Sequence, residues 1–145
     1  MHARLSTVFL VIAVLFIAVS GNSGQTSVAQ GPDYQERKLG VDLIRVINTA
    51  QMTYRDQSTG LFAEWNDLSQ SQGFGKAIDR FAHGDPKLKD VKRDGSTEIE
   101  PGWRLRLTVA PNKKSYVVFL ERTSDQKRYA LVSDEEGIIW QATAL

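Results

Sequence analysis

Apolar residues recur at helical spacing in the segment that follows Pro32. Neighbouring members of the repeat are three or four residues apart, which predicts one face of a helix of about six turns over residues 34–56. Asp33, with Glu36 three residues later, is a capping-box-like start. Gly40 lies inside the helix and costs up to about 1 kcal/mol relative to alanine, which predicts a bent or frayed turn. The repeat consists of Leu39, Leu43, Ile47, Ala50 and Tyr54.

The last third of the chain changes to a period of two, which is typical of β-strands with one solvated face. Apolar and polar residues alternate over 103–109, and three further strands are predicted over 115–122, 127–133 and 138–142. The apolar run in the second of these strands indicates burial on both faces. Turns rich in Pro, Asn, Asp and Gly join the four strands into an antiparallel meander.

One face of such a sheet must be covered, and the long helix is its expected partner. We therefore predict an α+β domain in which one long N-terminal amphipathic helix packs on a four-stranded antiparallel sheet. Between helix and sheet, single helical turns are predicted over 64–68 and 76–82, with irregular structure elsewhere. Charged residues dominate 85–93, as is typical of a solvated loop.

The first thirty residues have the pattern of an export signal. A short start with Arg4 precedes an uncharged apolar run over residues 5–19. Small residues allow cleavage before Gly21 or before Gln30, and both sites stay open. The run falls somewhat short of the roughly 20 residues that span a bilayer, and an uncleaved membrane anchor is the alternative.

These features divide the chain into three parts. Residues 1–29 are the predicted signal peptide or signal anchor with the start of a linker, and residues 30–33 are the end of that linker. Residues 34–145 are the predicted α+β domain. It is expected to be exported to the periplasm or beyond, and to be held at the inner membrane only if the apolar segment is not cleaved.

Composition and charge speak against several classes of function. The 18 Lys and Arg residues against 17 Asp and Glu give a net charge of +1, without the basic excess of nucleic-acid binders. The sequence has no cysteine, which excludes disulfides, thiolate metal sites and cysteine nucleophiles. Its only histidines are His2 and His83, and it has no Gly-x-Ser-x-Gly motif. We therefore expect no enzyme, no cofactor, no metal and no nucleic-acid partner.

Acidic residues in two turns raise the alternative of calcium binding. They are Asp85, Asp90 and Asp94 in one loop and residues 134–136 in another. Their spacing matches no calcium-binding loop, and lysines near the first loop compete for its carboxylates. Solvated loops are the preferred interpretation, with a calcium-stabilised variant as the weaker one.

Three segments resemble the globular domain of type IV pilins and type II secretion pseudopilins. Residues 45–54 (RVINTAQMTY) are similar to the second half of the long helix in that family. Residues 60–63 with Leu68 resemble the loop that follows it, and residues 129–139 resemble the last hairpin with its D-E-x-G-x-I turn. The similarity covers roughly residues 39–140. It implies a pilin-like fold and partners among pilus or secretion components.

The chain departs from the family pattern at its N-terminal end. Pilin precursors carry a glycine, an aromatic or Met residue and then Thr-Leu-x-Glu in front of the apolar helix. Here no glutamate lies in or beside the apolar run, and a linker that contains Gly24, Gly31 and Pro32 separates this run from the predicted helix. Filament assembly by the pilin route is therefore not expected.

Aromatic residues supply the candidate contact groups. Trp103 and Trp140 lie in strand patterns, which favours the core, whereas Trp65 is expected to be partly exposed. We predict a non-enzymatic accessory or divergent component of a pilus or secretion apparatus that acts by protein–protein contact. The alternative is a small periplasmic ligand-binding module that uses the loop aromatics in a cleft beside Trp65. The predicted contact residues are Leu61, Phe62, Trp65, Phe74 and Phe81.

Overall fold

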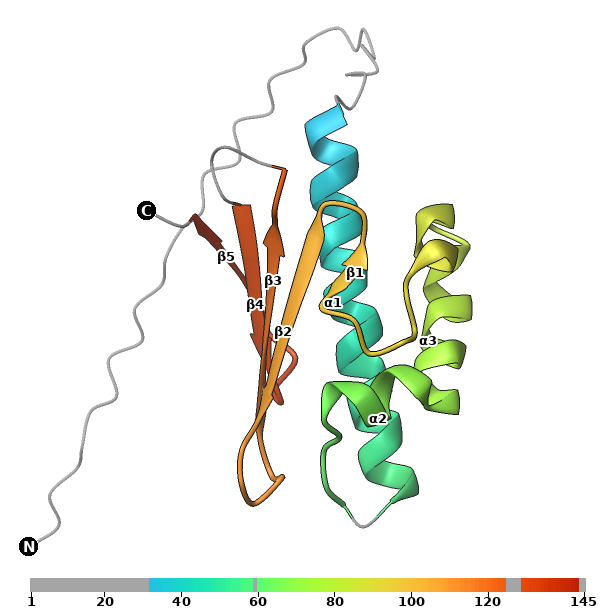
Figure 1. Cartoon of the computed structure of the whole chain (residues 1–145), viewed down its shortest axis with the longest axis vertical. Helices are drawn as coiled ribbons and strands as arrows, with labels where there is room; N and C mark the ends of the chain where they lie inside the picture. Colours follow the sequence, from blue (N-terminus) through green and yellow to red (C-terminus); the bar gives the residue numbers. More distant parts are fainter. Residues whose placement is uncertain (1–31, 59, 125–128, 144–145) are drawn as a thin grey trace, which may run out of the picture.

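Helix α1 (Pro32–Gln57) forms the middle layer of the molecule, with a β-sheet on one side and helix α3 (Gln72–Ala82) on the other (Figure 1). The computed structural model describes residues 32–58, 60–124 and 129–143. The predicted signal and all of the linker before Pro32 lie outside the described residues. The long helix predicted over residues 34–56 is confirmed, and it continues through Gly40 without a break.

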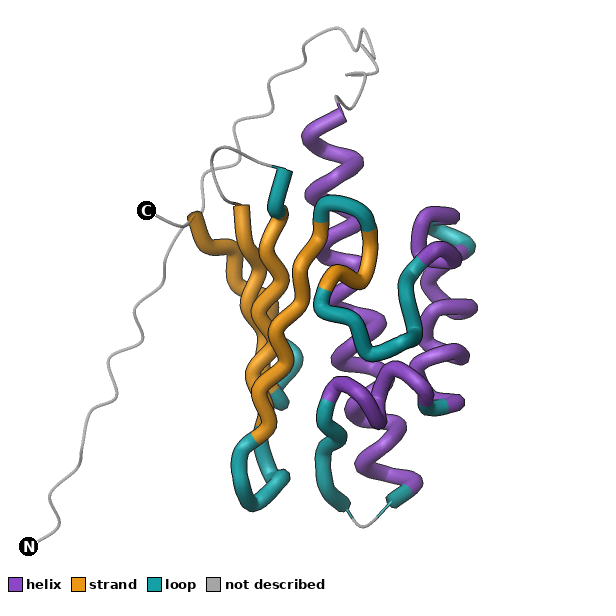
Figure 2. The backbone as a smooth tube through the Cα atoms, viewed as in Figure 1, coloured by secondary structure: helices purple, strands orange, loops and turns teal. Residues whose placement is uncertain are grey.

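The sheet has five strands in the order β1-β2-β3-β4-β5, and each strand is antiparallel to the next (Figure 2). The antiparallel meander is thereby confirmed, but the predicted number of four strands is wrong. The additional strand, β1, has three residues and pairs with the beginning of β2. The strands are β1 (Glu98–Glu100), β2 (Trp103–Val109), β3 (Tyr116–Arg122), β4 (Tyr129–Asp134) and β5 (Ile139–Thr143).

Strand register places the apolar core on the face of the sheet that is turned towards α1. Leu105 pairs with Leu120, and Leu120 pairs with Leu131, so one buried row crosses three strands. The expectation that the second predicted strand is buried on both faces is wrong. Val117 of β3 points to the face of the sheet opposite to the core and is 47% exposed, because no helix of the described chain covers that face (Figure 1).

Two polar residues of α1, the half-buried Asn48 and the fully buried Gln51, fix the helix against its neighbours. The Asn48 side chain accepts a hydrogen bond from the Tyr116 hydroxyl at 3.0 Å and donates one to Ser133 Oγ at 2.8 Å. Gln51 makes a reciprocal pair with the backbone of Ala63, at 2.8 and 2.9 Å. Buried polar groups need partners of this kind. Asn48 therefore ties the helix to β3 and β4, and Gln51 ties it to the following loop.

The region between helix and sheet is more regular than predicted. It forms α2 (Trp65–Gln70), α3 and the short 3₁₀ helix η1 (Pro86–Asp90). Ser71 begins α3, because its hydroxyl accepts a hydrogen bond from the amide of Phe74 at 3.1 Å. The charged stretch is not wholly solvated: Leu88, in the middle of η1, is fully buried.

The capping-box prediction is wrong, because α1 begins at Pro32, two residues earlier than expected. Asp33 therefore lies within the first turn, where its carboxylate pairs with Arg37 at 3.1 Å and with Arg122 at 3.5 Å. Glu36 pairs with Lys87 of η1 at 3.0 Å instead of returning to the helix start. Both acidic residues thus link α1 to other elements.

Candidate contact surfaces

Three of the five predicted contact residues lie in the core. Phe62 packs edge-on against Tyr116, with ring centroids 4.8 Å apart. Trp65 and Phe74 make a second edge-on pair at 5.3 Å. The Trp65 indole N–H donates to the carbonyl oxygen of Ser96 at 2.9 Å, which satisfies its polar atom inside the fold. These three side chains stabilise the domain and do not face an external partner.

The other two predicted contact residues are partly exposed. Leu61 follows the end of α1, and Phe81 lies in the last turn of α3, where the Arg80 guanidinium is 5.8 Å from its ring. The structure therefore does not assemble the five residues into one surface. The aromatic residues of this region were chosen from the sequence as contact groups, but the sequence did not distinguish those that fill the core from those that are exposed.

The tryptophans are distributed differently from the prediction. Trp103 is fully buried, as predicted. Trp65, expected to be partly exposed, is only 9% exposed because α2 turns it against α3. Trp140, expected in the core, is 45% exposed because it points away from α1 on the last strand of the sheet. Trp140 is thus the tryptophan available for an external contact.

The face of the sheet turned away from α1, here called the open face, carries a row of apolar side chains. Trp140 on β5 pairs with Val132 on β4, and Val132 pairs with Phe119 on β3. The row ends at Arg106 on β2, whose guanidinium lies 5.4 Å from the Phe119 ring. Val117 extends the row along β3. Exposed apolar groups that gather in this way commonly mark protein contact sites.

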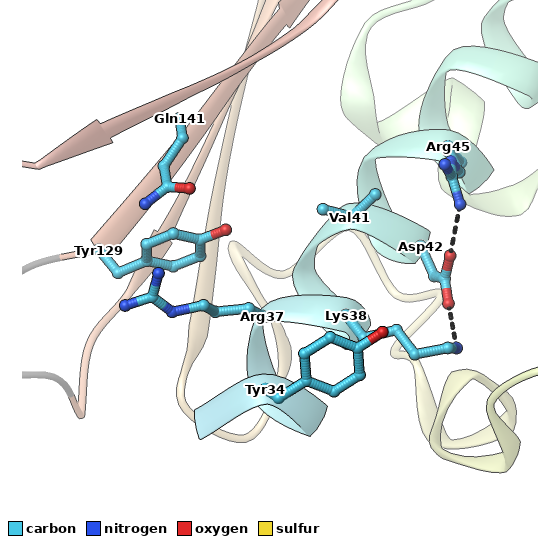
Figure 3. Close-up of a pocket in the computed structure, with 8 residues that line it drawn as sticks. All are labelled: Tyr34, Arg37, Lys38, Val41, Asp42, Arg45, Tyr129 and Gln141. Carbon is cyan, nitrogen blue, oxygen red and sulfur yellow. Dashed lines mark hydrogen bonds and ion pairs between the residues drawn. The ribbon is translucent and has the colours of Figure 1, made fainter. Parts of the chain in front are cut away.

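A groove lies across the N-terminal half of α1 beside β4 and β5 (Figure 3). Its volume is about 440 Å³. On the sheet side, the guanidinium of Arg37 stacks over the ring of Tyr129 at 5.0 Å. The exposed ring of Tyr34 lies at the beginning of the helix. The lining residues are Tyr34, Arg37, Lys38, Val41, Asp42, Arg45, Tyr129 and Gln141.

Positive charge dominates the groove. Its lining has three cations and one carboxylate, and the pairing of Arg37 with the adjacent Asp33 at 3.1 Å reduces the local net charge from +2 to +1. The carboxylate, Asp42, is buried and accepts from Lys38 Nζ at 2.6 Å and from an Arg45 guanidinium nitrogen at 3.2 Å. The hydrogen bond to Asp42 raises the pKa of Lys38 above its ordinary value. The groove therefore suits an anionic ligand better than a cationic one.

The groove was not predicted from the sequence, although the pattern of its helix residues can be found there. Tyr34, Lys38, Val41 and Arg45 are spaced by three or four residues, so they form a second helical stripe beside the apolar one. The sheet side of the groove depends on residues that are distant in sequence from the helix. Gln141 reaches the groove through strand register, which the alternation of residues does not determine.

The loop considered for calcium binding has a structural explanation. His83 is exposed at the end of α3, and Asp85 begins η1 by accepting a hydrogen bond from the amide of Lys87 at 3.2 Å. Among the described residues, no group of three potential metal-ligating side chains comes together. Within the same residues, no helix has the length and apolarity that crossing a membrane requires.

Comparison with known proteins leaves these surfaces to be interpreted from their own chemistry. No family model matches the chain, and neither a curated protein nor a solved structure is significantly similar to it.

Proposed function

We propose that this chain is a non-enzymatic exported protein with a pilin-like domain, and that it acts by protein–protein contact as an accessory or divergent component of a pilus or secretion apparatus. The arrangement of α1 over an antiparallel meander supports the resemblance of its segments to pilins. Within the resembling segment, Asn48 and Gln51 hold the helix to the sheet and to the following loop.

The open face of the sheet carries this proposal. Val117 and Trp140 are 47% and 45% exposed, and together with Phe119 and Val132 they offer an apolar surface that a purely solvated sheet would not need. Large aromatic side chains of this kind are frequent at the centre of protein interfaces. We therefore place the contact surface on the open face, in preference to the loop residues.

The alternative of a ligand-binding module with loop aromatics receives no support from the geometry. Its central residue, Trp65, is packed against Phe74, and its indole N–H already has a backbone partner. A ligand cannot stack on a ring whose faces are covered by the core.

Site-specific photo-crosslinking in the native cell tests the proposal. A photoreactive amino acid replaces Val117 on the open face in the full chain, and a control chain carries it in place of the exposed Lys76 on α3. We expect crosslinks from position 117, but not from position 76, to envelope proteins of a pilus or secretion apparatus, identified by mass spectrometry. Crosslinks only to unrelated proteins overturn the assignment to an apparatus. If positions 117 and 76 give the same crosslinks, the choice of the open face as the contact surface is overturned.

A further inference from the structure

The two edges of the sheet differ in their protection against pairing with another strand. The β1 edge has only three residues, two of them glutamates, and its register shifts between Glu98 and Glu100. Pro101 follows directly. Shortness, charge, irregular register and proline are the features by which proteins prevent an edge strand from adding a neighbour. The β1 edge is therefore closed to pairing.

The β5 edge has none of these features. Strand β5 (Ile139–Thr143, IWQAT) contains no charged residue and no proline, and its pairing with β4 is regular over all five residues. It combines branched and aromatic residues, which favour strand structure. A strand edge of this kind is a template for an additional strand.

The two sides of β5 present different chemistry to such a strand. Trp140 lies on the open face, beside Val132. Gln141, the next residue, lies on the other side of the sheet and lines the cationic groove together with Arg37 (Figure 3). Successive side chains of an added strand would alternate between the same two sides. One side therefore favours apolar groups, and the other favours carboxylates.

The charge of the groove also decides between a second copy and a different partner. Two copies paired through β5 would bring together two grooves of net positive charge, and like charges at an interface are unfavourable. A partner strand with acidic residues complements the groove, and its apolar residues extend the row that ends at Trp140. The occupant that fits both sides is an extended segment in which acidic and apolar residues alternate.

We propose that β5 binds an extended segment of a partner protein, in which carboxylates face Arg37 in the groove and apolar side chains lie beside Trp140 on the open face. This inference rests on the proposed role in protein contact and specifies the chemistry of the partner. Backbone hydrogen bonds along β5 would provide affinity, and the two sides would provide selectivity.

Binding of synthetic peptides to the purified full chain tests the inference. The probe is a capped peptide of alternating glutamate and valine, and its matched control replaces every glutamate by lysine. We expect the glutamate peptide to bind at least roughly tenfold more tightly at low salt, because the charge complements the groove. Hydrogen exchange of the β5 amides is expected to slow on binding. Equal binding of the two peptides, or no protection of β5, overturns the inference.

Two substitutions at Gln141 on the β5 edge are expected to change the affinity for the peptide in opposite directions. A general loss of stability would not produce opposite changes. Gln141→Lys should strengthen binding of the glutamate peptide severalfold, and Gln141→Glu should weaken it severalfold. Arg37→Gln should also weaken it, whereas Lys76→Gln on α3 should have no effect. Protection of β5 that appears with rising protein concentration in the absence of peptide would identify a second copy as the occupant and overturn the proposal.

The outcomes separate this inference from the proposed function. If the peptide does not bind but position 117 does crosslink to the apparatus, only the strand-addition site at β5 is ruled out. Peptide binding without crosslinks to a pilus or secretion apparatus retains the site and removes the proposed assembly.

Discussion

The indole ring of Trp103 lies directly against the backbone of Gly40. A Cβ atom built at Gly40 would be 2.5 Å from Cη2 of this ring and 3.0 Å from both Cζ2 and Cζ3. The glycine that interrupts the helical pattern of α1 is therefore what allows the sheet to approach the helix. Its intrinsic cost to the helix is offset by the burial of a complete tryptophan side chain.

Gly40→Ala should destabilise the protein, although alanine is the better helix former. The methyl group gains up to about 1 kcal/mol of helix propensity, but it overlaps a ring that the core holds in place. Overpacking of this kind costs about 1–3 kcal/mol, so we expect a net loss of stability in urea unfolding followed by tryptophan fluorescence.

Gly75→Ala is the matched control for this experiment. Gly75 is also inside a helix, α3, but the three atoms nearest to its added Cβ all belong to the guanidinium end of the Arg93 side chain, which can move aside. We expect this variant to be neutral or stabilised by up to about 1 kcal/mol. Equal effects of the two substitutions would contradict the role of Gly40 as a site of close approach.

Tyr116→Phe should weaken the contact between α1 and the sheet. The substitution removes the hydroxyl that donates to Asn48 Oδ1 and leaves this oxygen without that donor. A cost of about 1–2 kcal/mol is expected in urea unfolding, whereas Tyr34→Phe at an exposed site should change stability little. Equal stability of the Tyr116→Phe variant and the unmodified chain would show that the hydrogen bond contributes nothing.

The same tyrosine should make stability depend on pH in the alkaline range. Burial raises the pKa of Tyr116 well above its ordinary value of 10.0. The unfolded chain therefore loses this proton first as the pH rises, and the stability that is present below pH 10 decreases above it. Ultraviolet titration should show fewer ionised tyrosines in the folded chain than in urea at the same pH. Identical titration curves would contradict the burial of the hydroxyl.

The sequence patterns predicted those elements whose signal is local and repeated. The stripe from Leu39 to Tyr54 located α1, and the alternation from Trp103 to Val109 located β2. Strand β1 was missed because three residues with one apolar member, Ile99, are too short to show a period. Helix α3 was predicted too short because Gly73 and Gly75 resemble breakers, although both lie within it.

The exposure of Trp65 and Trp140 was not predictable from local pattern. Trp140 has the alternation of a core residue, but the order of strands places it at an edge and the register turns it outwards. Trp65 lies in a segment rich in polar residues, yet the chain returns at Ser96 to accept its indole hydrogen. Both outcomes depend on contacts between residues that are distant in sequence, and the groove beside β5 has the same origin.

Asp42→Asn should destabilise the groove side of α1. The side chain of Asp42 is only 8% exposed, and its charge is balanced by Lys38 and Arg45. The amide keeps the shape but loses the charge-assisted hydrogen bonds, so we expect a loss of about 1–2 kcal/mol in thermal or urea unfolding. Asp56→Asn is the control, because Asp56 is exposed at the C-terminal end of α1, where a negative charge is not favoured. A larger cost at Asp56 than at Asp42 would contradict the assigned pairs.

Glu100→Gln should stabilise the protein at neutral pH. Glu100 is 8% exposed, and its Oε2 atom has no hydrogen-bond partner among the described residues. Burial, followed by the nearby charge of Asp90, raises the pKa of Glu100 above its ordinary value of 4.5. The folded chain therefore holds this proton more tightly than the unfolded chain, and stability is lost as the pH rises from about 4.5 through the folded-state pKa.

The neutral amide removes the cost of a buried charge, so the free energy of unfolding of the variant should exceed that of the unmodified chain by about 1 kcal/mol at pH 7. The difference should vanish in acid, where Glu100 is protonated in both the folded and the unfolded state. Glu98→Gln on the same strand is the control. Its side chain is 56% exposed beside Lys92, and its replacement should have little effect at any pH. Urea unfolding across this pH range measures both variants, and an advantage of Glu100→Gln that persisted at pH 3 would show that the gain does not come from the buried charge.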